Sequence, residues 1–254
     1  MDVAPPPQLR RKIPAWVPFV LSAALVARLL LFATHEPLTV ALFAALLLLL
    51  LIPGHLARRR VRQVLRSGDV HSVLTAWSSN IAKLPYPETM GPLITAAAFA
   101  SCGWVQQART AMQRSVRGPA WEAALEHRLF VETLLDAFEG DRESALSKAS
   151  RLSSLPLPLT GPFMKSRVRV LRDALAAFAR AFAHLGTLRD LELLERASKK
   201  SPLVHWAMLY AAAVIAIDNG NLFHAKKLLS TAPAWPEDSA FHSFHAELSG
   251  MVGA

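Results

Sequence analysis

Two histidines near the C-terminus have the spacing that a metal site would use. His242 and His245 lie three residues apart, which places both side chains on one face of a helix, and Glu247 follows closely. A functional zinc site needs at least a third protein ligand and supporting hydrogen bonds, for which His224 is the candidate. We interpret these residues as ordinary surface side chains of a C-terminal helix, and we expect no bound metal.

A group of acidic residues has spacing suited to general acid–base chemistry. Glu122 and Glu126 are one helical turn apart, and Glu132 and Asp136 continue the series. Proton transfer in catalysis also requires a closed pocket around the carboxylates. We expect these side chains to form the acidic lining of an open groove instead, which would suit a basic peptide segment.

Other sequence patterns that catalysis uses are missing. The chain has no Gly-rich phosphate loop, no nucleophile elbow and no pair of cysteines. Its single cysteine, Cys102, follows an alanine-rich stretch, and we expect a small buried side chain compatible with a reducing compartment. The sequence therefore predicts a protein that is not an enzyme, with no catalytic residue and no cofactor.

Two apolar stretches near the N-terminus predict a transmembrane hairpin over residues 13–57. Ile13 to Ala33 contains 21 residues, and Pro37 to Ile52 follows after a short turn. About 20 apolar residues cross the hydrocarbon core of a bilayer. Neither stretch has the polar face of a buried soluble hairpin, and the cleavage site of a signal peptide is missing. A single anchor followed by a buried helix is the alternative.

Basic residues predict the orientation of this hairpin. Lys and Arg near a span mark its cytoplasmic side, and here they precede the first span and follow the second, whereas the turn has none. Both termini should therefore be cytoplasmic. The charge inside the first span, Arg28, can reach the interface by snorkelling or pair with Glu36. The flanking residues are Arg10, Arg11, Lys12, Arg58, Arg59, Arg60, Arg62 and Arg66.

The net charge of +9 reflects membrane attachment more than nucleic-acid binding. Residues 1–66 carry nine Lys and Arg against two acidic residues, so that +7 belongs to this part and +2 to residues 67–254. A nucleic-acid-binding domain keeps a basic stripe on its folded surface. The nearest candidate is spread around a helix, so we expect no nucleic-acid partner. Its members are Lys165, Arg167, Arg169 and Arg172.

Regularly spaced glycines and prolines organise the remaining sequence. Four glycines are each followed by a proline sixteen residues later, and Gly68 is followed by Pro85 after seventeen. Glycine ends a helix at low cost, and proline stops the next helix about three turns later. The four glycines are Gly103, Gly140, Gly186 and Gly220. We expect the residue five positions after each of the five glycines to face the preceding helix. These residues are Val73, Ala108, Ala145, Leu191 and Ala225.

This pattern resembles the tetratricopeptide repeat, a helix-turn-helix unit of 34 residues. The turn glycines, the alanines at 108, 145 and 225, the closing prolines at 119, 156, 202 and 236, and Phe99 and Phe182 carry the resemblance over residues 55–236. The glycine spacings of 35, 37, 46 and 34 depart from it, as does Leu191. The resemblance implies an α-solenoid of about five repeats that binds a protein segment. An irregular helical bundle is the alternative.

The chain is thus predicted to be all-α and to have four parts. These are a basic Pro-rich tail (1–12), the transmembrane hairpin (13–57), a helical-repeat domain (58–236), and a capping helix with a tail (237–254). Helices are expected near 55–66, 70–83, 88–102, 104–116, 119–138, 141–153, 163–185, 187–199, 202–218, 221–231 and 238–250. The cationic helix 55–66 either continues the second span as a stalk, which we favour, or lies on the inner leaflet.

These features predict a membrane-anchored cytoplasmic scaffold that binds a protein or peptide partner. Its excess of arginine over lysine, with abundant alanine and leucine, is typical of GC-rich bacteria and points to the inner membrane. The alternative is a structural or regulatory subunit of an oligomeric transport or secretion complex, in which the hairpin and Arg28 do the work. Expected partner contacts are Glu122, Glu126, Arg128, Arg169 and Trp206, and expected membrane contacts are Arg28, Arg58, Arg59 and Arg60.

Overall fold

A computed structural model describes residues 56, 59–81, 84–158 and 161–253. The chain divides into two compact units, Met1–Arg59 and Arg60–Ala254. The expected tail 1–12, all but Leu56 of the expected hairpin 13–57, and the membrane contacts Arg28 and Arg58 lie outside the described residues. Within the described ranges, no helix combines the length and the apolar character that crossing a bilayer requires.

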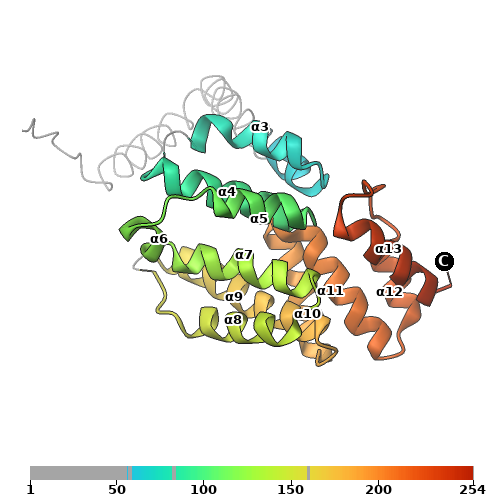
Figure 1. The fold of residues 1–254 in the computed structure, drawn as a ribbon. Helices are drawn as coiled ribbons and strands as arrows, with labels where there is room; N and C mark the ends of the chain where they lie inside the picture. The colour runs from blue at the N-terminus through green and yellow to red at the C-terminus, as the bar shows by residue number, and fades with distance from the viewer. Residues whose placement is uncertain (1–55, 57–58, 82–83, 159–160, 254) are drawn as a thin grey trace, which may run out of the picture. The chain divides into compact units, whose positions relative to one another are not determined.

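All regular elements in the described part of the chain are helices, which confirms the all-α prediction there (Figure 1). Residues 59–66 are helical, and Arg59 and Arg60 are exposed on this helix. The elements that follow are α3 (Val70–Ile81), α4 (Pro87–Ser101), α5 (Val105–Gln113), α6 (Pro119–Ala123), α7 (Leu125–Phe138), α8 (Arg142–Ser154), α9 (Pro162–Phe182), α10 (Leu188–Lys200), the 3-10 helix η1 (Pro202–Val204), α11 (His205–Asp218), α12 (Leu222–Leu229) and α13 (Ala240–Met251).

Neighbouring helices pack as hairpins. The pairs are α4 with α5, α7 with α8, α9 with α10, and α11 with α12, and the first helix of each pair also packs on the first helix of the next. Gly68, Gly103, Gly140 and Gly220 have positive φ in the turns, as expected. At the fourth turn the expectation is wrong, because His184 takes the left-handed conformation (φ 57°) instead of Gly186.

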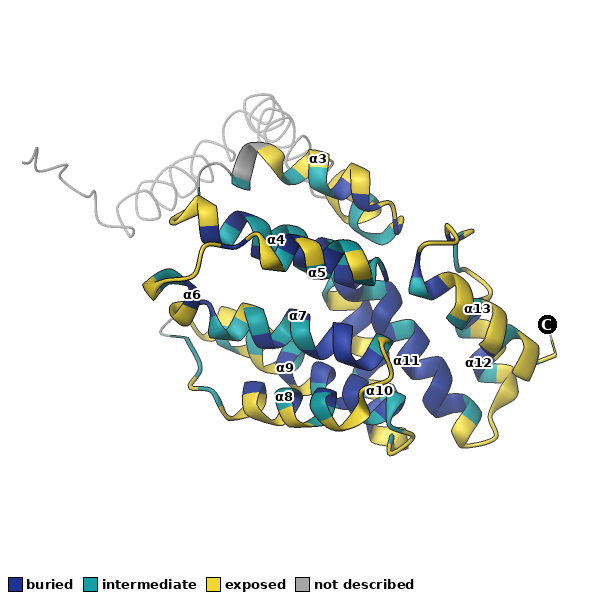
Figure 2. Cartoon of the chain, in the orientation of Figure 1, coloured by how far each residue is buried: buried dark blue, intermediate teal, exposed yellow. Residues whose placement is uncertain are grey.

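Small side chains bring the helices together. Val73, Ala108, Ala145 and Ala225 are each at most 1% exposed, as their positions after the turn glycines predict. Leu191 is only half-buried, because α10 turns Asp190, Leu194 and Ala197 inward instead. In α11, every residue from Trp206 to Ala216 except Leu209 is buried, so that this helix forms the centre of the core (Figure 2).

The C-terminal helix completes this core. Phe241 of α13 is fully buried, Leu248 is 7% exposed and Phe244 packs against the core. Phe241 and Phe244 contact the ring of Phe138 with centroid distances of 5.4 and 5.8 Å. The helix therefore covers apolar side chains of α7 as well as those of its neighbours α11 and α12.

Segments far apart in the sequence meet at a seam between the first and last helices. The Trp206 indole Nε1 donates a hydrogen bond of 2.6 Å to the carbonyl oxygen of Arg66. A Cβ atom on Gly68 would lie 2.5 Å from two ring carbons of Trp235. Nearby, the hydroxyl of Ser239 donates to the carbonyl oxygen of Cys102 at 2.9 Å. These contacts fasten the chain before α3 and the α4–α5 turn to the C-terminal part of the domain.

We predict that Gly68→Ala destabilises the domain more than Gly140→Ala does. Both glycines have positive φ, but a Cβ atom meets nothing within 4 Å at Gly140 and collides with Trp235 at Gly68. The left-handed backbone alone should cost about 1 kcal/mol, and with the collision about 2–4 kcal/mol. Urea unfolding of the full chain, followed by circular dichroism, measures both. Equal losses would contradict a close Gly68–Trp235 contact.

Candidate functional site

A large apolar groove is the candidate binding site of the helical domain. It has a volume of about 670 Å³, and eleven of its fourteen lining residues are apolar. Its walls come from α3, α4, α7 and α9, with single contributions from α8 and η1. The lining residues are Trp77, Ile81, Leu84, Ile94, Ala97, Glu126, His127, Phe130, Leu152, Pro158, Val168, Leu171, Arg172 and Leu203.

Helical periodicity explains how so many apolar side chains face one space. Each of the four main helices contributes side chains three or four positions apart, and such side chains share one face of a helix. The pairs are Trp77 with Ile81, Ile94 with Ala97, Glu126 with Phe130, and Val168 with Leu171. The break between α6 and α7 at Ala124 places Glu126 in the first turn of α7.

Arg172 is the charged residue in the groove wall that the sequence interpretation missed. Its side chain is 5% exposed, and it binds Glu126 through Nε (3.1 Å) and Nη2 (3.0 Å). Nη1 and Nη2 also donate to the carbonyl oxygens of Leu155 and Pro156, at 2.6 and 3.2 Å. Arg172 falls on the same helical face as Val168, Leu171 and Leu175, which is the signal that places it inward. It neutralises Glu126 and holds the α8–α9 loop.

The acidic groove lining expected from the sequence is not formed. Of the four carboxylates only Glu126 reaches the groove, where Arg172 neutralises it. Glu122 lies 3.7 Å from Arg128, and Glu132 lies 3.6 Å from Lys148. Basic residues of the same domain therefore balance this acidic series, and a basic peptide finds no unneutralised acidic wall in the groove.

Asp136, the last member of the series, forms a buried network instead. It is 4% exposed and accepts hydrogen bonds from Lys148 (2.6 Å), Ser144 (2.7 Å) and Arg109 (2.9 Å). Burial opposes ionisation of this carboxyl, but the three donors outweigh it and hold its pKa below the usual value of 3.8. Asp136 thus ties α7 to α5 and α8 as an ionised structural residue.

The five expected partner contacts do not share one surface. Glu126 lies in the groove, whereas Glu122 is exposed and Arg128 stacks over the ring of Trp121 at 4.2 Å. Arg169 is exposed on α9. Trp206 is 7% exposed and belongs to the core and the seam, since its position in α11 turns it inward.

His224 and His245 contact side chains of neighbouring helices, and Cys102 is buried. Nδ1 of His245 lies 3.1 Å from the hydroxyl of Tyr210, and Nε2 of His224 lies 2.5 Å from Glu195. Across the described ranges, no three His, Cys, Asp or Glu residues come together as a metal site would require. Cys102 is buried, and burial raises the pKa of its thiol to about 12, so that it stays protonated at neutral pH.

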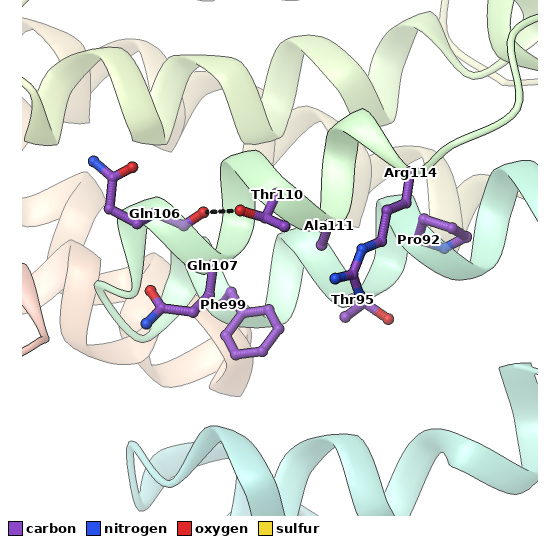
Figure 3. A pocket seen from close by; sticks show the side chains of 8 residues that line it. All are labelled: Pro92, Thr95, Phe99, Gln106, Gln107, Thr110, Ala111 and Arg114. Carbon is purple, nitrogen blue, oxygen red and sulfur yellow. Dashed lines mark hydrogen bonds between the residues drawn. The ribbon is translucent and has the colours of Figure 1, made fainter.

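A second hollow of about 490 Å³ lies on the α4–α5 hairpin (Figure 3). Phe99 and Thr95 of α4 face Gln107 of α5 and Arg114, which directly follows α5. The hydroxyl of Thr110 donates to the carbonyl oxygen of Gln106. This hollow draws on two adjacent helices and mixes polar and apolar side chains. The groove joins six elements and is mainly apolar, which makes it the stronger candidate for binding a ligand.

Comparison of the chain with protein-family models, with curated proteins and with solved structures found no match.

We predict that Asp136→Asn lowers the free energy of unfolding by about 2 kcal/mol at neutral pH, because charge-assisted hydrogen bonds are lost. The pKa of Asp136 is lower in the folded than in the unfolded state, so its contribution is complete above the unfolded pKa and disappears as the pH falls through the folded pKa. Wild-type and variant stabilities should therefore converge below pH 3.8. Urea unfolding at several pH values measures this, with the exposed Glu143→Gln as control. A pH-independent difference would contradict the network.

Proposed function

We propose that this protein is a membrane-anchored cytoplasmic adaptor whose helical domain binds an apolar segment of a partner protein. The two N-terminal apolar stretches and their flanking basic residues support anchoring in the inner membrane, with both termini in the cytoplasm. Division of the chain near Arg60 supports a separate helical domain. Attachment to a membrane would raise the effective concentration of this domain near other membrane proteins.

The single observation that carries this proposal is the apolar groove. Eleven apolar side chains line it, and the ion pair between Arg172 and Glu126, the one carboxylate among its described lining residues, is internal. A basic or acidic peptide would lose hydration there without gaining an opposite charge. An apolar helix face fits better, because each large side chain buried contributes about 1.5–3 kcal/mol. The partner segment is therefore proposed to present aliphatic or aromatic residues at helical spacing.

A tetratricopeptide-like solenoid remains part of this proposal. It draws support from the succession of helical hairpins, from the positive φ of four turn glycines and from the buried alanines that follow three of them. The first helices of successive hairpins, α4, α7 and α9, supply most of the groove. A groove on these helices is where the family resemblance implies that a protein segment binds.

Site-specific photocrosslinking tests this function. We expect a photoreactive amino acid at Ile94 or Phe130, both half-buried in the groove, to yield the same protein adduct in native membranes. The matched control is Glu143, which is exposed on α8 outside the groove. Mass spectrometry identifies the adducts, and the intensity of the shifted gel bands shows their abundance.

The same experiment includes a variant that decides whether the groove itself binds. Ile81→Gln, in the groove wall on α3 and thus on another helix than the reporter at Phe130, should reduce the adduct several-fold because it introduces an amide that loses its hydration on binding. Circular dichroism verifies that this variant remains folded. Groove positions that give no adduct, or the same adducts as position 143, would overturn the proposal.

A further inference from the structure

Four large apolar side chains are exposed at two turns of the helical domain. Leu185 and Leu188 lie at the α9–α10 turn, with exposed fractions of 61% and 62%. Leu222 and Phe223 lie at the α11–α12 turn, with exposed fractions of 44% and 82%. Exposed apolar side chains are common singly, but several in one place mark an interaction surface. These four residues, here called the turn patch, are not among those that line the groove.

Two side-chain contacts show that the two turns adjoin. The helices α9 and α11, which end at these turns, pack against each other, and the turns lie at the same end of the domain (Figure 1). Nδ1 of His184, next to Leu185, lies 3.0 Å from the carboxylate of Asp218 at the end of α11. Nε2 of His224, in the first turn of α12, lies 2.5 Å from Glu195 of α10. The turn patch is therefore one surface made by two hairpins.

The neighbouring α7–α8 turn shows that a turn of this array does not need exposed apolar side chains. It joins the preceding hairpin, and α7 packs on α9. Its exposed side chains are all charged, as is usual for a turn in contact with water. They are Glu139, Asp141, Arg142 and Glu143. The leucines and the phenylalanine of the turn patch therefore serve a purpose other than forming their turns.

The charges behind the turn patch have opposite signs on its two helices. Glu192 is exposed on α10 one helical turn after Leu188, and Lys227 is exposed on α12 one helical turn after Phe223. Other carboxylates close to the two turns are already paired within the domain. They are Asp190 with Arg180, Glu195 with His224, and Asp218 with His184. The patch thus has an acidic side on α10 and a basic side on α12.

This arrangement of charge favours a second copy of the chain over other occupants. An anionic lipid surface or a nucleic acid requires a clear excess of basic side chains. Here Arg189, Lys226 and Lys227 are exposed together with Glu192 and Asp218, so both signs are present. A two-fold axis places α10 of one copy opposite α12 of the other, and each such contact occurs twice. Apolar side chains then meet apolar ones, and the acidic side meets the basic side.

We propose that the turn patch is the contact between two copies of this chain in a symmetric dimer. Leu188 of one copy lies against Phe223 of the other, and Glu192 of one copy faces Lys227 of the other. Four side chains supply only part of the about 800 Å² that each partner contributes to a stable interface, so the dimer is weak in free solution. Confinement to one membrane would favour it, and this last step alone rests on the proposed anchoring.

Photocrosslinking in cells that express the full chain tests this contact. A photoreactive amino acid at Leu185 should yield an adduct of twice the chain mass of 27.8 kDa, with peptides of this chain alone. Phe223→Glu should reduce this adduct about tenfold, because it places a charge in the centre of the contact. Phe163→Glu is the matched control. Phe163 is also the second residue of a helix and is 74% exposed, but it lies about 30 Å away at the other end of α9.

Exchange of the two rim charges distinguishes a second copy from any other occupant. Glu192→Lys alone and Lys227→Glu alone should each reduce the adduct about threefold or more, because the like-charge pair occurs twice across the axis. The double variant should restore the adduct, since opposite charges face each other again in both halves of the contact. A different partner would not change its own charges and would give no such restoration.

Four results would overturn the inference. These are the absence of a chain–chain adduct in the wild type, an adduct only with another protein or with lipid, an equal loss in Phe163→Glu and Phe223→Glu, and a double charge variant that does not restore the adduct. The reporter at Leu185 lies outside the groove, so its result is separate from that of the groove reporter at Phe130. Loss of either adduct alone therefore shows which of the two proposals fails.

Discussion

The contact between Gly68 and Trp235 is the constraint on which the helical domain depends. The ring of Trp235 can lie against the backbone at residue 68 only because glycine has no Cβ. The same indole donates to the hydroxyl of Tyr210 at 2.7 Å and packs edge-on against Trp206. Trp206 in turn binds the carbonyl oxygen of Arg66. These bonds join the segment before α3 to the C-terminal helices, so that the array of hairpins is fastened at both ends.

The groove follows from this seam. Trp77 on α3 and Leu203 in η1 are distant in sequence, yet both line the groove, and both pack on the small core around Val70 and Cys102. α3 therefore has its place because the seam fastens the chain just before it. Leu203 has its place because α11 begins directly after η1 and is buried along most of its length. The apolar groove between Trp77 and Leu203 stays open because the seam and the buried helix α11 hold the surrounding helices in place.

Local features of this fold could be predicted from the sequence, and contacts between distant segments could not. Glycine turns, helix-ending prolines and apolar periodicity depend on a few neighbouring residues, so the helices fall close to their expected positions. The break at Ala124 and the left-handed conformation of His184 could not be predicted in this way. The glycine at 186 allows close packing against Ile215 and does not supply the left-handed turn residue. The prediction of an acidic groove was wrong because the basic residues that neutralise Glu122, Glu126 and Glu132 come from other helices and could not be assigned from the sequence. The inward position of Arg172 was readable from its helical face, but its binding to Glu126 required the fold.

α7 carries side chains of different chemistry on its two faces. Glu126 turns to the apolar groove, and Arg128, two residues later, stacks over the ring of Trp121. Such a division requires the helix to be fixed in rotation, since a rotation of one residue would bring a charge into the apolar face. Arg172 fixes one side by binding Glu126, and Trp121 fixes the other by stacking under Arg128. The break between α6 and α7 lets Trp121 reach this position. One short segment of chain thereby holds both Glu126 in the groove and Arg128 on the ring of Trp121.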